Sequence, residues 1–134
     1  TGGGGGGSGN ANNNSPGGRG GSGVVILRIT VTPTLAKVNS FTITGAANKR
    51  SSGTISANLN TSGTVTFYAN GRQIAGCKNI QTTGTSPNIT AICNWKPIFS
   101  GMNYITASIS ASAFGYSNGS SATSSTIAKR NVSR

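Results

Sequence analysis

The sequence contains no aspartate, no glutamate and no histidine among its 134 residues. General acid–base catalysis uses these side chains most often, and a serine nucleophile would have only lysine as its base. Paired-carboxylate glycoside hydrolysis and carboxylate sites for calcium or magnesium are excluded. Two cysteines alone cannot complete a zinc site. We therefore expect a protein that is not an enzyme and that needs no cofactor or metal ion.

Charge of the other sign is present, because 11 Lys and Arg give a formal net charge of +11. These residues are spread along the chain, and only Lys49-Arg50 and Lys129-Arg130 are adjacent. Such a balance suits an anionic surface polymer as partner, or it serves only solubility through like-charge repulsion. Sites for single-stranded nucleic acid interleave cations with stacking aromatics. An aromatic content of 6% argues against a nucleic-acid partner without excluding one.

No apolar run approaches the ~20 residues that cross a bilayer, and no signal peptide is present. The chain begins at Thr1, so we expect a processed product or a fragment of a secreted protein. Cys77 and Cys93 are an even pair in a small chain rich in Ser, Thr, Asn and Gly. This favours a disulfide and an extracellular location over two buried free thiols.

Residues 1–23 form a glycine-rich arm with no apolar side chain larger than alanine, so they cannot build a core. Such a segment is a flexible linker, unless it packs on neighbouring subunits or in a polyproline-II-like arrangement. Residues 24–32 follow as an apolar strand that Pro33 ends. Period-2 alternation gives this strand one fully apolar face, formed by Val25, Leu27, Ile29 and Val31.

Residues 33–128 show short alternating strands with turn signals between them and no sustained 3.6-residue period. Asn70-Gly71 is typical of a two-residue type I′ hairpin. We expect a last strand at 121–128 and a basic tail at 129–134. The spacing predicts an all-β, antiparallel β-sandwich. Its expected core residues are Phe41, Ile43, Ile55, Leu59, Val65, Phe67, Ile89, Trp95, Ile105 and Ile109.

Three runs resemble bacterial Ig-like repeat domains: SGTVTFYANGRQIAGC at 62–77, NITAICNWKP at 88–97 and NYITASISASAFGYSNGSSA at 103–122. The resemblance extends over residues 35–128 and implies an Ig-like sandwich without an active site. Many such repeats carry turn aspartates as calcium ligands, and some form isopeptide bonds through an acidic residue. This chain has no acidic residue, so we expect neither feature.

The run GGRGGSGVVILRI at 17–29 separately resembles the end of glycine-rich regions in secreted bacterial surface proteins. That resemblance implies a secreted or surface-attached bacterial protein built for adhesion or assembly. A fibre tip made of bundled polyglycine would show several regular glycine repeats, and only one irregular block is present.

These observations predict a structural subunit of an extracellular filament, with its own copies as partners. The strand at 24–32 is then donated to a neighbouring subunit, where its apolar face fills pockets; the competing interpretation pairs it within its own domain as the first strand. A head-to-tail contact would propagate into an open polymer. The alternative function is an adhesin or polyanion-binding surface module that uses the +11 charge.

Overall fold

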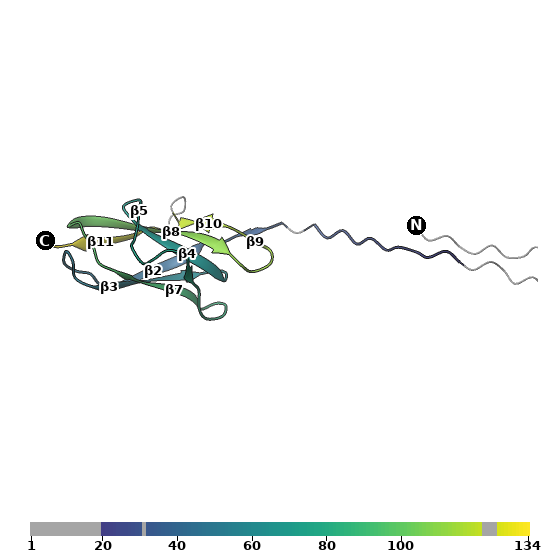
Figure 1. Ribbon diagram of the computed structural model, residues 1–134, viewed down its shortest axis with the longest axis horizontal. Coiled ribbons are helices and arrows are strands. Elements are labelled where there is room, and N and C mark those ends of the chain that lie inside the picture. The colour runs from purple at the N-terminus through teal and green to yellow at the C-terminus, as the bar shows by residue number, and fades with distance from the viewer. Residues whose placement is uncertain (1–19, 31, 122–125) are drawn as a thin grey trace, which may run out of the picture. The chain divides into compact units, whose positions relative to one another are not determined.

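The computed structural model of the chain describes residues 20–30, 32–121 and 126–134. The chain divides into two units, Thr1–Val31 and Thr32–Arg134, and we refer to the second as the domain. The described part is all-β, with eleven strands and no α-helix (Figure 1). No helix in these ranges is long and apolar enough to cross a bilayer. Most of the predicted glycine-rich arm lies outside the described residues.

The first sheet has three antiparallel strands in the order β2-β3-β7. They are β2 (Val38–Gly45), β3 (Gly53–Leu59) and β7 (Ile89–Trp95). Apolar residues alternate with polar ones in β3 and β7, and the alternate side chains are buried. Ile55 faces Cys93 across this pair of strands. The period of two in the sequence therefore gives the sheet one core-facing side.

The second sheet is built on the antiparallel pair of β4 (Gly63–Ala69) and β8 (Gly101–Ala111). β4 also pairs with two short strands, β5 (Arg72–Gln73) and β6 (Ile80–Gln81). On its other side β8 pairs with β10 (Gly119–Ser120) and β11 (Ala128–Val132). A small parallel sheet joins β1 (Thr34–Leu35) to β9 (Tyr116–Ser117).

One hydrophobic core receives side chains from both larger sheets. Eight residues predicted as core are buried: Ile55, Leu59, Val65, Phe67, Ile89, Trp95, Ile105 and Ile109. Phe41 and Ile43 are only half-buried and pack against the margin of the core. They lie on β2, which pairs with a strand on one side alone in the described part of the chain. An edge position leaves part of an inward side chain uncovered.

The hairpin predicted at Asn70-Gly71 is present. Ala69 pairs with Arg72, so the two residues between them form the whole turn. Asn70 and Gly71 have φ values of 50° and 76°. A type I′ turn requires positive φ at both central positions, which Asn and Gly adopt at low cost.

The prediction for the C-terminal strand was wrong. The last strand is β11, and it contains Lys129 and Arg130, which we had expected in a tail. Val132 is buried, Arg130 is half-buried and Lys129 is exposed. The long apolar stem of Arg130 takes an inward position that a hydrophobic residue would normally occupy. The period-2 apolar pattern of β11 is therefore not visible in the sequence, because a charged residue stands at an inward position. Residues 122–125 of the predicted strand lie outside the described residues.

Cys77 and Cys93 form a disulfide with a Cα–Cα distance of 5.5 Å. Both cysteines are buried, so the cross-link ties β7 to the loop between β5 and β6 within the core. The two residues are 16 apart in sequence. In the chain-entropy model, closing a loop of this size stabilises the folded state by about 3 kcal/mol.

Replacing both cysteines, as Cys77→Ala with Cys93→Ala, should lower the free energy of unfolding by about 3 kcal/mol, because the unfolded chain regains the loop entropy. Urea denaturation followed by tryptophan fluorescence at Trp95 measures this change. An unchanged midpoint would show that the cross-link adds no stability.

Candidate assembly site

The apolar run at residues 24–30 has no partner in the described structure. It carries no strand assignment and belongs to no strand pair, and Figure 1 shows it as extended chain. Its apolar side chains are exposed, with Val25 at 94% and Leu27 at 79%. Whether this run pairs within its own domain or with a neighbouring subunit stays a prediction, and Val31 lies outside the described residues. A strand forms only when another edge satisfies its backbone groups.

In the part of the chain that the structure describes, residues 24–30 have both exposed apolar side chains and unpaired backbone groups. Monomers seldom expose contiguous apolar surface of this kind, and the backbone donors and acceptors of residues 24–30 make no hydrogen bond among the described residues. Addition to the free edge of a sheet satisfies both at once: main-chain hydrogen bonds form, and alternate side chains are covered. Residues 24–30 thus expose the apolar side chains and backbone groups that strand addition would use.

The domain has a free edge along β2. Thr90 and Thr83 donate backbone hydrogen bonds to each other, at 2.8 and 2.9 Å. The backbone N–H and C=O groups of the even-numbered residues of β7 therefore point away from β3. The backbone groups of the odd-numbered residues of β7 therefore bond to those of the odd-numbered residues of β3. The backbone groups of the even-numbered residues of β3 point towards β2.

In this ladder Thr42 of β2 lies opposite Ser56 and bonds to it. The backbone groups of its neighbours Phe41 and Ile43 then point away from the sheet. No other strand of the described residues pairs with β2, so these groups form an unpaired row at the edge, although β11 lies close to β2. The inward side chains at this edge are the half-buried Phe41 and Ile43 themselves.

The opposite edge of the same sheet is obstructed. Thr83 occupies the edge of β7 at Thr90. Farther along, the Cys77 Sγ atom lies 3.3 Å from the Asn94 carbonyl oxygen. In the second sheet β5, β6 and β10 have two residues each, and short edge strands are poor templates for pairing. The β2 edge has eight residues, more than any of these short strands and more than the five of β11, which pairs with β8 alone among the described strands.

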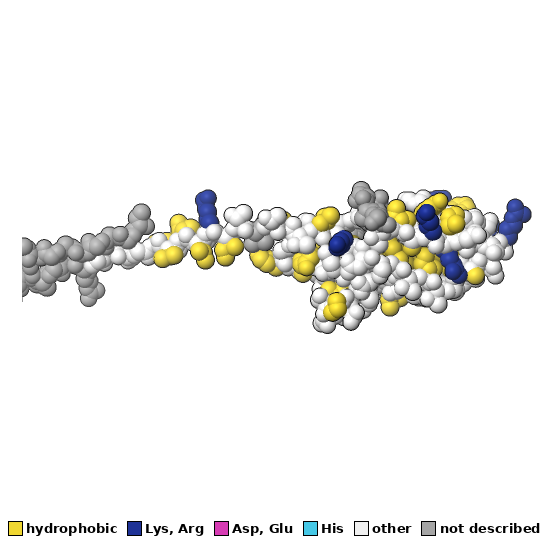
Figure 2. Space-filling model, turned by 180° about the vertical axis from the view of Figure 1, so that it is seen from behind, with side chains coloured by type: hydrophobic (Ala, Val, Ile, Leu, Met, Phe, Trp, Pro, Cys, Tyr) yellow, Lys and Arg dark blue, Asp and Glu magenta, His cyan; other side chains and the backbone are white. Residues whose placement is uncertain are grey.

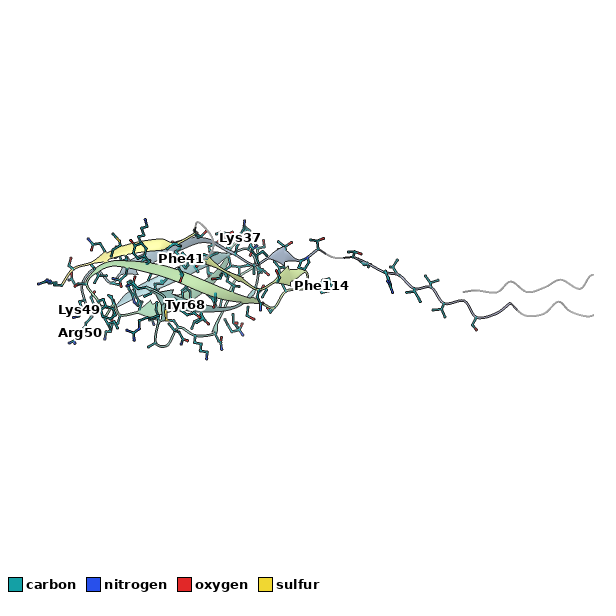
Figure 3. The ribbon with its side chains drawn as sticks, turned by 90° about the horizontal axis from the view of Figure 1, so that it is seen from above. Lys37, Phe41, Lys49, Arg50, Tyr68 and Phe114 are labelled. Atoms are coloured by element: carbon teal, nitrogen blue, oxygen red, sulfur yellow. A yellow bond between two sulfur atoms is a disulfide. The ribbon has the colours of Figure 1, made fainter. Side chains whose placement is uncertain are left out.

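The β2 edge is closed at one end and open at the other. Arg130 donates from Nη2 to the Gly45 carbonyl oxygen at 2.6 Å, and Asn48 forms a parallel bridge with Ser133. At the other end, a hollow separates β2 from the start of β11. It is lined by Asn39, Phe41, Thr126, Ile127 and Ala128. Figure 3 labels Phe41, one of these lining residues, within the domain.

Amide hydrogen exchange of the dilute chain should alternate along β2. We expect rapid exchange at Phe41 and Ile43, whose N–H groups face solvent, and slow exchange at Thr42 and Thr44, whose N–H groups bond to β3. NMR of the ¹⁵N-labelled chain measures the four rates. Slow exchange at all four would mean that the edge is already occupied.

No protein-family model, curated protein or solved structure was found to match this chain.

Proposed function

We propose that the chain is a structural subunit of an extracellular bacterial filament, in which residues 24–30 of one copy add a strand to the β2 edge of the next. The observation that carries this proposal is that one chain exposes both an unpaired apolar strand and an unpaired strand edge. A donor and an acceptor on different surfaces of one chain make a heterologous contact, which continues into an open polymer.

The proposed domain is an Ig-like β-sandwich. The order β2-β3-β7 matches strands A, B and E of that fold, and β4-β8-β11 matches strands C, F and G. The sequence runs that resemble bacterial Ig-like repeats fall on β4, β7 and β8. The disulfide favours an oxidising compartment, which supports an extracellular location.

The added strand extends the core of the acceptor. Val25, Leu27 and Ile29 alternate along the donor, so they lie beside Phe41 and Ile43 and cover their open flanks. Each apolar side chain that becomes fully buried contributes about 2 kcal/mol. Ordering the donor backbone costs about 1–2 kcal/mol per residue and offsets much of this gain. Assembly therefore depends on every apolar side chain of the donor face.

The chemistry of the contact is independent of ion pairs. No carboxylate side chain exists to pair with the 11 cations, so backbone hydrogen bonds and apolar burial hold the subunits together. Added salt screens repulsion between the basic copies, and the filament persists at high salt.

Replacing two donor residues, as Leu27→Gln with Ile29→Gln, should raise the critical concentration for assembly by at least about tenfold, since 1.4 kcal/mol corresponds to a factor of ten. The matched control, Val24→Gln with Ile26→Gln, alters the other face of the strand and should have a smaller effect. Sedimentation of the full chain over a concentration series measures both.

Negative-stain electron microscopy of the unaltered chain tests the proposal directly. Filaments are expected at concentrations above the critical value. Discrete monomers at every concentration would overturn the proposal. If filaments form, hydrogen exchange should now be slow at Phe41 and Ile43; protection at another edge instead would reject β2 as the acceptor while keeping the filament.

A further inference from the structure

Seven of the 11 cations gather at one end of the domain, although the sequence spreads them from position 49 to 134. They are Lys49, Arg50, Arg72, Lys96, Lys129, Arg130 and Arg134. We call this set the basic end. Figure 3 shows Lys49 and Arg50 there and Lys37 well away from it, and Figure 2 shows Lys and Arg side chains gathered over the same end.

Backbone contacts hold the basic end together. The Lys49 amide donates to the Ser133 carbonyl oxygen at 2.8 Å, and the Arg50 amide donates to the Pro97 carbonyl oxygen at 2.8 Å. The turn after β2 is thereby fixed between the residues that follow β11 and those that follow β7. The cations beside these anchors, Lys96 and Arg134, come into the same region as a result.

No side chain compensates the positive charge at this end. The chain has no Asp or Glu, so no side chain can form an ion pair with any of the seven cations. Lys129 Nζ lies 5.8 Å from the centre of the Tyr104 ring, and Arg130 bonds to a neutral carbonyl oxygen. A dense cluster of one sign raises the local concentration of anions and speeds their association.

A pocket opens within the basic end, between the β4–β5 hairpin and the segment that follows β7. Arg72 and Lys96 both line it, together with Gln73. Neither cation makes a side-chain hydrogen bond among the described residues, and both are exposed. Its volume of about 220 Å³ is below the range of about 300–1,000 Å³ for drug-sized ligands. A unit of monosaccharide size suits it.

Apolar side chains border the same pocket. Ile98 and Phe99 line it and are 60% and 50% exposed. A site for small inorganic anions alone would not need these apolar groups. The surface therefore suits a polymer whose units have both a negative group and an apolar face.

We infer that the basic end binds an acidic polysaccharide, with a carboxylated sugar in the pocket between Arg72 and Lys96. The guanidinium of Arg72 and the ammonium of Lys96 bind the carboxylate, while the C–H face of the ring packs on Phe99. The remaining cations follow neighbouring units of the polymer. Two exposed aromatic residues offer little stacking for a nucleic-acid strand, and the disulfide favours a partner outside the cell.

Binding of polygalacturonate to the dilute full chain tests this inference, with neutral dextran as the negative control. Isothermal titration calorimetry should show binding of polygalacturonate and no binding of dextran. The affinity for polygalacturonate should fall as the salt concentration rises. The double variant Arg72→Gln and Lys96→Gln should bind polygalacturonate about tenfold more weakly, or weaker still. The control pair, Lys37→Gln with Lys78→Gln, removes the same charge from residues that do not line the pocket and should cost much less.

Equal losses in the two double variants would overturn the site, because net charge alone would then explain binding. Equal affinity for dextran would overturn the ligand class. Single-stranded DNA or phosphatidylglycerol vesicles are the other arms; tighter binding to either at equal salt would assign the basic end to that class instead. Since all four side chains are exposed, thermal unfolding should be unchanged in both variants, which separates lost binding from lost folding.

Discussion

Backbone hydrogen bonding between strands is the interaction on which the structure depends. Each strand of the core is held by a ladder, and a ladder leaves unsatisfied groups wherever it stops. Two such places occur among the described residues: the outer edge of β2 has unpaired backbone groups, and residues 24–30 are an apolar segment that pairs with no strand. The same force that builds the domain therefore also defines where it can be extended.

The absence of carboxylates gives that force greater weight. A typical domain has ion pairs on its surface, each of small value, but this one has no side chain that could form them. Apolar burial between the two sheets, the ladders and the Cys77–Cys93 cross-link remain. In the proposed complex, charge has a different role: it acts between molecules, where the basic end would bind an anionic polymer.

Local signals in the sequence predicted local features of the fold. Asn70-Gly71 marked its hairpin because only a few residues accept two successive positive φ values, and alternation marked β3 and β7 because both are covered on one face. Features that depend on neighbours were missed. The uncovered flanks of Phe41 and Ile43 follow from the sheet order, which period-2 patterning does not contain.

The basic end was missed for a related reason. Arg72 and Lys96 are separated by two strands, β6 and β7, and their loops, and only the folded domain puts them in one pocket. The strand at 128–132 was placed too early because Arg130 stands where an apolar residue was expected. Long-range register and the dual nature of an arginine stem are properties of the folded chain rather than of any window of sequence.

The disulfide has a consequence for proton binding. With both thiols locked in it and with Asp, Glu and His absent, the chain has no side chain of a type that titrates between about pH 2 and 8. Its side chains then bind the same number of protons folded and unfolded over that range, so acidification adds no side-chain slope to its stability. No side chain of the protein therefore contributes to the acid response of a complex with a carboxylated polymer, whereas the carboxylates of the polymer do. The protein would keep a constant side-chain charge over this range, and protonation of the polymer would determine at which pH the polymer is released.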